Sequence, residues 1–196
     1  MSRRFPSQGF IDKEVKRIDE YFNKLTSKKI SMPNASISTK VRDVEWYSNN
    51  TIFINPEYIP KGENISYKAM LAHGFFHHVQ SELMHFYKSD KIRESLGINS
   101  SNKEKIIDLL NNFVESSAMF FAAAYLTRNE TKISRNKKIL CYLSSRYFLP
   151  PKGKFFYGNS VVLSPLQKNK YNVRKTILQM LTYKGVTTIL KNRLKE

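Results

Sequence analysis

Two histidines on one predicted helix place the strongest constraint on how this chain folds. His73 and His77 lie four residues apart in the apolar stretch AMLAHGFFHH, from Ala69 to His78. On an α-helix, side chains at positions i and i+4 project from the same face, about one turn apart. Two imidazoles with this spacing can bind a single metal ion. The sequence therefore predicts a helix within an apolar environment that carries part of a metal site.

The rest of the chain predicts a mixture of helices and short strands. Apolar residues recur at intervals of three and four from Asp12 to Leu25, as in an amphipathic helix. The turn-forming stretch Ser48-Asn49-Asn50 predicts a hairpin between two strands. We therefore expect an α+β fold, in which a small antiparallel sheet on the N-terminal side packs against a mainly helical core.

Breaker residues and turn signals define the expected boundaries of the other elements. The predicted strands are Ser36 to Val41, Val44 to Tyr47 and Thr51 to Ile54. Further helices are predicted at about Ser66 to Tyr87, Lys103 to Leu126, Ile133 to Tyr147 and Val173 to Arg193. The chain between the last two of these helices is expected to be irregular as far as Pro165.

The length of the chain and its apolar runs favour one domain without a membrane span. The 196 residues contain no internal repeat or convincing linker, so we treat residues 1–196 as a single domain. The longest apolar run, Ala118 to Leu126, is far short of the roughly 20 residues that cross a bilayer. The N-terminal residues lack the apolar core of a signal peptide, and the single Cys141 excludes an intramolecular disulfide. These features predict a cytoplasmic or otherwise intracellular protein.

The positive charge of the chain is concentrated in its C-terminal third. The formal net charge is +17. Residues 1–130 hold 18 basic and 15 acidic side chains, whereas residues 131–196 hold 15 basic side chains and one acid, Glu196. Two interpretations of this basic helical part remain open. It either serves solubility, or it presents a surface to a polyanion such as nucleic acid or acidic lipid headgroups.

A third metal ligand is expected from the next predicted helix. Catalytic zinc sites usually have three protein ligands and one open position. Glu115 lies in the apolar stretch FVESSAMFFAAAYL, where an unpaired carboxylate would be unfavourable, and it is the best candidate. An exposed or salt-bridged glutamate would also fit this pattern. Asp108 and Glu104 are weaker candidates, because they lie nearer the polar start of that helix.

Three further ionisable residues, on the predicted helix that carries the two histidines, are not expected to be metal ligands. His78 lies about 100° round the helix from its neighbour, which favours a supporting or structural role. His85 follows His73 by twelve residues and does not match the spacing of three-histidine zinc sites. Glu82 lies five residues after His77 and should point away from the ligand face.

The histidine pair departs from the zinc motif H-E-x-x-H at one position. Gly74 occupies the place of the glutamate that serves as general base in that motif. A glycine also destabilises a helix interior by about 1 kcal/mol relative to alanine. Gly74 either lets another group approach the metal or is a substitution that silences a protease, and the sequence leaves both interpretations open.

The two motifs together resemble the gluzincins, a group of zinc metallopeptidases, and are nearest to the ImmA/IrrE-like branch. LAHGFFHHVQ resembles the form LAHE-x-x-H-H-x-Q, and VESSAMFFAAAYL is similar to E-x-x-A-N-x-F-A-x-x-L-L. Met119 replaces the Asn of the second motif, and Tyr125 replaces its first Leu. YSNNTIFINPEYI resembles the strand that runs along the substrate cleft. The resemblance covers roughly residues 44–126.

The resemblance implies a zincin-like domain in which His73, His77 and Glu115 bind Zn²⁺. In the family mechanism the metal activates a water molecule, and the motif glutamate accepts its proton. General acid–base catalysis typically contributes about 10²–10⁴-fold, and Gly74 has no side chain to supply it. A tyrosine often stabilises the oxyanion in such enzymes. The unranked candidates are Tyr142, Tyr147 and Tyr157.

Three functional hypotheses follow from these residues. The first is a zinc-binding metallopeptidase-like protein that is inactive or severely impaired, a pseudoenzyme on a hydrolase scaffold, with a polypeptide substrate or protein partner. The second is an active zinc hydrolase with an unrecognised base. The third is a nucleic-acid-binding protein that uses the basic C-terminal third.

Overall fold

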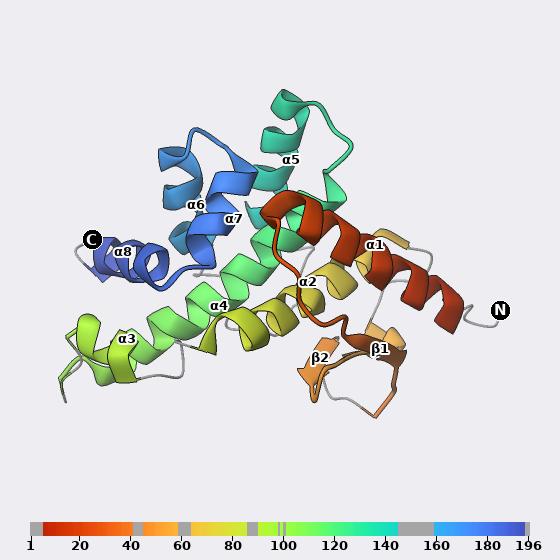
Figure 1. Cartoon of the computed structure of the whole chain (residues 1–196), viewed down its shortest axis with the longest axis horizontal. Helices are drawn as coiled ribbons and strands as arrows, with labels where there is room; N and C mark the ends of the chain where they lie inside the picture. The colour runs from red at the N-terminus through yellow and green to blue at the C-terminus, as the bar shows by residue number, and fades with distance from the viewer. Residues whose placement is uncertain are drawn as a thin grey trace.

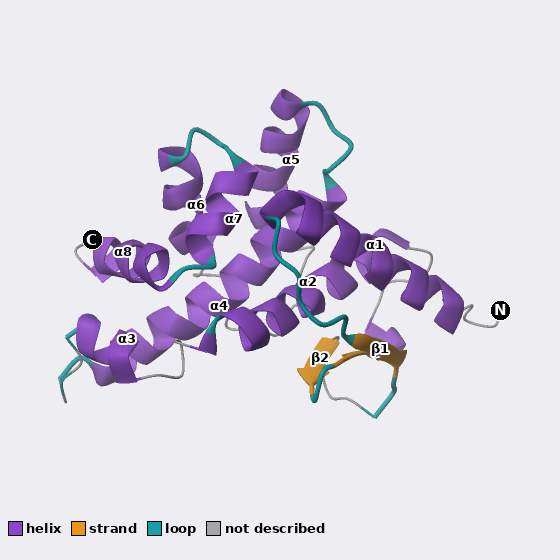
Figure 2. Cartoon of the chain, viewed as in Figure 1, coloured by secondary structure: helices purple, strands orange, loops and turns teal. Residues whose placement is uncertain are grey.

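The protein is mostly helical, with one small sheet (Figure 2). The computed structural model describes residues 6–40, 45–58, 64–85, 90–97, 99, 101–144 and 159–194. Its helices are α1 (Gln8–Thr26), α2 (Asn64–Leu83), α3 (Asp90–Ser95), α4 (Lys103–Leu126), α5 (Lys132–Ser144), α6 (Asn159–Lys168), α7 (Val173–Met180) and α8 (Tyr183–Leu194). The strands are β1 (Asn34–Ile37), β2 (Glu45–Ser48) and β3 (Thr51–Ile54), followed by the 3₁₀ turn η1 (Pro56–Tyr58). The predicted α+β class is confirmed.

The helices α2 and α4 form the centre of the molecule (Figure 1). The sheet lies at one side, against α1 and α2, whereas α5, α6 and α7 pack on α4. α7 also contacts α1. Within the described ranges, every helix is too short or too polar to traverse a bilayer.

The sheet contains the predicted hairpin, but it is mixed rather than purely antiparallel. β2 and β3 pair antiparallel across Asn49 and Asn50, whose φ angles of 49° and 60° are typical of a tight hairpin turn. β1 pairs with β3 in parallel, and the strand order is β1-β3-β2. Because β1 lies beside β3 and not beside β2, its neighbour in sequence, two strands that run in the same direction become adjacent.

The N-terminal and central helices begin and end close to the predicted positions. α1 starts where the Ser7 hydroxyl accepts a 3.2 Å hydrogen bond from the Phe10 N–H, and it ends at Ser27, which has a φ of 58°. α4 has the predicted bounds, and α2 begins two residues before the expected Ser66. α3 was not predicted. The predicted ends of two helices, Tyr87 and Tyr147, lie outside the described residues.

The predicted irregular segment before Pro165 is partly wrong, because α6 begins at Asn159. Pro165 lies inside α6 and cannot donate a backbone hydrogen bond there. Val162 and Leu166 are nevertheless buried, and α6 packs on α4 and α8. Burial of this apolar face holds the helix together across a residue that normally ends one.

The predicted helix from Val173 to Arg193 is divided into α7 and α8. The hydroxyl of Thr182 accepts a 3.1 Å hydrogen bond from the Gly185 N–H, and this cap starts a new helix. A Cβ atom at Gly185 would lie 2.0 Å from the carbonyl oxygen of Gln179. The close approach of the two helices at this break therefore requires glycine.

Aromatic rings join α1, α2 and α4 in the core. Phe121 of α4 stacks on Phe75 and Phe76 of α2, with ring centroids 6.0 and 5.0 Å apart. Phe22 of α1 contacts Phe121 edge-on at 6.0 Å. All four rings are fully buried. Their packing determines how the metal-site faces of α2 and α4 approach each other.

A buried carboxylate forms a second link between α1 and α4. Glu14 is fully buried, and its Oε1 accepts a 2.7 Å hydrogen bond from the Tyr125 hydroxyl. Its Oε2 accepts from Arg17 at 3.2 Å. The guanidinium carbon of Arg128 lies 3.9 Å from the centroid of the Tyr125 ring. Burial and the Glu14 carboxylate raise the pKa of Tyr125, so its hydroxyl remains a donor.

Tyr125→Phe should lower the free energy of unfolding by about 1–3 kcal/mol, because a buried carboxylate oxygen loses its donor. The matched control is Tyr21→Phe, which removes a longer bond, 3.2 Å to the neutral Ala124 carbonyl. This control should lose only about 0.5–1.5 kcal/mol. Urea unfolding of both variants measures the difference. Equal losses would mean that Glu14 does not depend on Tyr125.

Candidate metal centre

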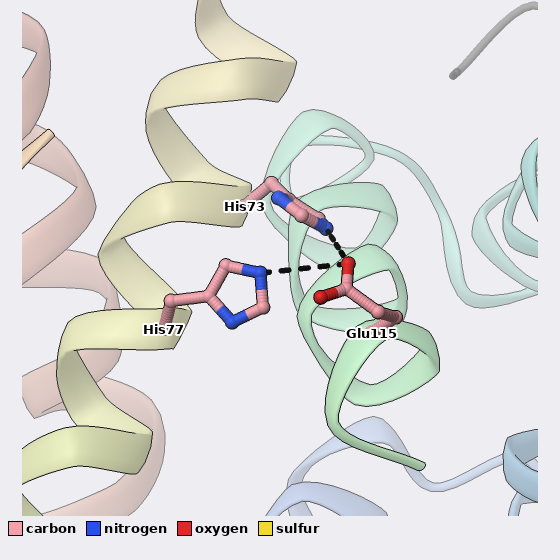
Figure 3. Close-up of side chains that lie close together, drawn as sticks. All are labelled: His73, His77 and Glu115. Atoms are coloured by element: carbon pink, nitrogen blue, oxygen red, sulfur yellow. Dashed lines mark ion pairs between the residues drawn. The ribbon is translucent and has the colours of Figure 1, made fainter. Parts of the chain in front are cut away.

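Three side chains from two helices converge on one point, and they could hold a metal ion. His73 and His77 project from successive turns of α2 toward Glu115 of α4 (Figure 3). The Glu115 Oε2 lies 3.5 Å from the His73 Nε2 and 3.6 Å from the His77 Nε2. One ligand atom from each residue lies within 4.8 Å of the other two. Ligand atoms of a tetrahedral zinc ion lie about 3.3 Å apart, given metal–ligand distances of roughly 2.0–2.1 Å.

The orientation and exposure of these side chains leave room for a further ligand. The two imidazole rings are nearly perpendicular, at 87°, with their centroids 4.5 Å apart. The side chains of His73 and His77 are 14% and 17% exposed, and that of Glu115 is 32% exposed. The three side chains are therefore partly exposed, although the His73 Nε2 atom is itself buried. This arrangement is typical of a site with three protein ligands and one open position.

The Glu115 carboxyl remains ionised beside the two histidines. Burial alone would raise its pKa, because it disfavours the charged form. When the two imidazoles are protonated, their hydrogen bonds and positive charge outweigh burial and hold the pKa of Glu115 well below its ordinary range. When the imidazoles are neutral, each offers a nitrogen lone pair beside the Glu115 carboxylate, a donor set that suits a divalent metal.

Gln80, the last residue of the stretch LAHGFFHHVQ, is a buried partner of this group whose role was not predicted from the sequence. Its Oε1 lies 2.8 Å from the His77 Nδ1. Its amide nitrogen donates to the Val114 carbonyl and to the Ser117 hydroxyl, each at 2.8 Å. Val114 and Ser117 flank Glu115 on α4. Its position could have indicated this role, because Gln80 follows His77 by three residues on a largely apolar helix.

His78 faces away from the metal group and has a structural role, in line with its position round the helix. The side chain is 1% exposed, and its Nδ1 lies 2.8 Å from the Tyr47 hydroxyl of β2. Its Nε2 lies 2.6 Å from the Ser31 carbonyl oxygen. Glu82 accepts hydrogen bonds from both the backbone and the hydroxyl of Ser31. This face of α2 therefore attaches the sheet and the chain that precedes it.

Glu104 and Asp108 do not join His73, His77 and Glu115 in the group that could hold a metal ion. Glu104 and Asp108 are exposed on the first turns of α4. Tyr142 packs against the edge of the core. Gly74 is buried in α2 immediately after His73. Two of the oxyanion candidates, Tyr147 and Tyr157, lie outside the described residues.

Comparison with known proteins does not assign the site. The chain matches no family model, no curated protein and no solved structure. Its interpretation therefore rests on the geometry of His73, His77 and Glu115.

His77→Ala should abolish binding of about one divalent ion per chain, because the remaining pair cannot enclose a metal. Metal that binds only the folded state should stabilise the wild type by about 2.7 kcal/mol when its free concentration is 100 times the Kd. His85→Ala, which removes an exposed histidine outside the group, is the control and should retain both effects. Metal analysis and thermal unfolding with and without chelator test this. Wild-type protein that binds no metal would contradict it.

Proposed function

We propose that this chain is a zinc-binding, metallopeptidase-like protein whose centre lacks a general base. The observation that carries the proposal is the convergence of two imidazole nitrogens and one carboxylate oxygen, from side chains that are partly exposed. This donor set favours zinc over calcium or magnesium, which prefer oxygen ligands alone. Two helical histidines and one carboxylate also occur as the protein ligands of catalytic zinc sites.

The residues at this centre could hold a metal ion, but Gly74 cannot act as a general base. His73, His77 and Glu115 would hold the ion, which when bound supplies a Lewis acid to polarise a carbonyl group. Gly74 offers no atom that accepts a proton. Neither His78 nor Glu82 replaces it, because both are engaged with Tyr47 or Ser31 on another face of α2. The proposed centre would therefore bind and orient a peptide group, whereas neither Gly74 nor these two residues could supply the base that completes hydrolysis.

A protein with such a centre is best suited to hold a polypeptide segment. A zinc ion held by His73, His77 and Glu115 would supply a Lewis acid for a carbonyl or carboxylate oxygen of such a segment. Without general-base catalysis, the bound segment remains uncleaved or is cleaved very slowly. We therefore expect a protein partner or an uncleaved peptide ligand. Robust chelator-sensitive proteolysis by the wild type would instead favour an active hydrolase with a different base.

Gly74→Glu should create measurable proteolysis of an unfolded protein substrate. The new carboxylate would follow the first ligand on α2, and general-base catalysis should raise the cleavage rate by about 10²–10⁴-fold. Gly74→Gln is the matched control, because it adds a side chain of the same size without a proton acceptor at neutral pH. Cleavage is followed by gel and by mass spectrometry, and zinc content is measured in all proteins.

The double variant Gly74→Glu, Glu115→Ala tests whether the introduced base acts only when metal is bound. It should lose both zinc and activity. Equal activity in Gly74→Glu and Gly74→Gln would argue against a missing base. A folded, zinc-loaded and inert Gly74→Glu variant would mean that the cleft is also unsuited to hydrolysis.

A second candidate function, nucleic-acid binding, is supported by the turn between α6 and α7. Lys168, Lys170, Arg174 and Lys175 are all exposed there. The sequence contains no acidic residue from Thr131 to Lys195. Clustered cations of this kind bind phosphate groups without strong sequence preference.

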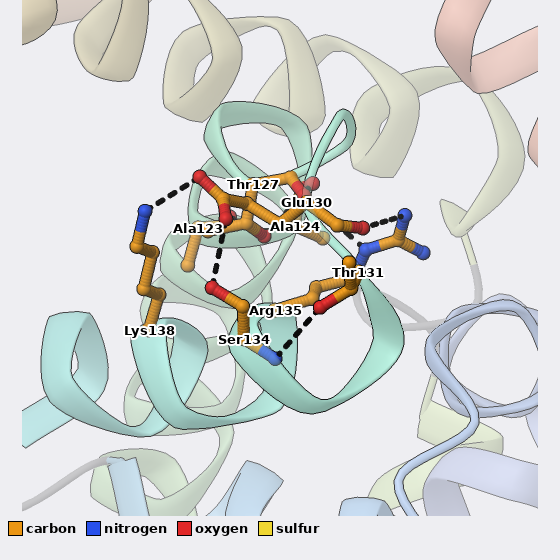
Figure 4. Close-up of polar contacts among 8 residues, drawn as sticks. All are labelled: Ala123, Ala124, Thr127, Glu130, Thr131, Ser134, Arg135 and Lys138. Carbon is orange, nitrogen blue, oxygen red and sulfur yellow. Dashed lines mark hydrogen bonds and ion pairs between the residues drawn. The ribbon is translucent and has the colours of Figure 1, made fainter.

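Two other basic residues of the C-terminal third serve the fold (Figure 4). The Arg135 guanidinium donates to the carbonyl oxygens of Thr127, Arg128 and Glu130, and so ties α5 to the end of α4. Lys138 forms an ion pair with Glu130. The net charge of this region therefore overstates the number of cations that can contact a polyanion.

Charge reversal at Arg174 and Lys175 should weaken the binding of DNA or RNA at all sequences alike. The log of affinity should fall linearly with log salt, and loss of two phosphate contacts should reduce that slope by about 2. The matched control reverses Lys13 and Lys16, exposed residues of α1, which changes the net charge equally. Fluorescence anisotropy at several salt concentrations measures both. If the wild type does not bind at low salt, the basic part serves solubility alone.

A further inference from the structure

We infer that Gln80 is the positioning residue of the metal centre: it selects the tautomer of His77 and holds the turn of α4 that carries Glu115. The inference rests on the proposed function, because it concerns the same centre. In addition, the hydrogen-bonded Gln80 amide arranges the candidate ligands before any metal binds.

The burial of Gln80 makes its hydrogen bonds decisive. The residue is 6% exposed and lies one turn after His77 on α2. A buried amide without partners is strongly unfavourable, so its two ends must face groups of opposite character. One end faces the metal centre, and the other faces the backbone of α4.

The orientation of the amide follows from its partner on α4. A backbone carbonyl can only accept a hydrogen bond, so the Gln80 atom 2.8 Å from the Val114 oxygen must be the NH₂ group. The Gln80 oxygen then faces the His77 Nδ1 at 2.8 Å, and that nitrogen must carry a proton. In the neutral imidazole, the lone pair is therefore on Nε2. This is the nitrogen that lies 3.6 Å from the Glu115 Oε2.

The same amide also restrains the turn of α4 that carries Glu115. The Val114 carbonyl and the Ser117 hydroxyl, which both accept from Gln80, come just before and just after Glu115. Ser117 in turn donates to Val114 at 3.0 Å. A shift of α4 along α2 would break these bonds together. Gln80 therefore links the position of the carboxylate ligand to the tautomer of the imidazole ligand.

An amide at residue 80 can both accept a hydrogen bond from His77 and donate to α4, whereas a carboxylate can only accept. A carboxylate at residue 80 could accept the His77 proton, but it could not donate to the Val114 carbonyl. An apolar side chain of similar size could do neither. These differences define three variants: Gln80→Met removes both interactions, Gln80→Asn shortens the amide by one methylene, and Gln80→Glu keeps only the acceptor.

The experiment combines ¹⁵N NMR of the metal-free protein at pH 8 with competition titration of zinc. Wild-type His77 should be in the Nδ1–H form. Gln80→Met and Gln80→Asn should shift it toward a mixture of tautomers and weaken zinc binding by about 10–100-fold. Gln80→Glu should retain the Nδ1–H form but melt at a lower temperature. The matched control is Gln179→Met, since Gln179 of α7 accepts from Asn169 far along the chain from the centre, and it should change neither readout.

A wild-type tautomer in both Gln80→Met and Gln80→Asn, with unchanged zinc affinity, would overturn the inference and leave the proposed zinc site intact. Failure of the wild type to bind zinc would overturn the proposed function, while the metal-free NMR measurement would still test the effect of Gln80 on His77. If Gln80→Met does not fold, the His77 tautomer and the zinc affinity are compared in Gln80→Asn and Gln80→Glu. Loss of the Nδ1–H form in Gln80→Glu would also contradict the inference.

Discussion

The contact between α2 and α4 is the interaction on which the rest of the structure depends. Stacking of Phe75 and Phe76 on Phe121 removes large apolar surfaces from water and brings the two helices together. The polar residues between these helices must then satisfy one another. Gln80 does so by bridging His77 and the α4 backbone. The apolar packing thus provides the stability, and the polar contacts determine the alignment.

The two polar faces of α2 perform different tasks. His77 points toward Glu115, whereas His78, one residue later, points toward β2 and the chain before it. The difference follows from the rotation of about 100° per helical residue. One face therefore has two partly exposed histidines near a carboxylate. The other has a buried histidine whose nitrogens are both hydrogen-bonded, which makes it part of the scaffold.

The missing side chain at Gly74 concerns one position of the proposed centre, and His73, His77 and Glu115 still converge. Gly74 lies on α2 between the two histidines, yet the contacts of Gln80 and Glu115 described above involve no side chain there. A centre of this kind can retain metal binding while it lacks a proton acceptor, because the ligands are held by helix packing. The basic C-terminal part is a separate feature, and Arg135 illustrates how cations in that part can also serve the fold by binding backbone carbonyls.

Features that depend on neighbouring residues could be predicted from the sequence. Helical periodicity and apolar patterning were enough to predict α4, the hairpin turn at Asn49 and Asn50, and the shared face of His73 and His77, and the apolar setting of Glu115 marked it as a candidate ligand. Tertiary structure alone decided the parallel pairing of β1 with β3, the helix around Pro165 and the partners of Gln80. These depend on contacts between residues far apart in sequence, where burial and hydrogen-bond satisfaction override local propensity. For that reason the candidate ligands could be identified in the sequence, whereas the hydrogen-bond partners of Gln80 on α4 could not.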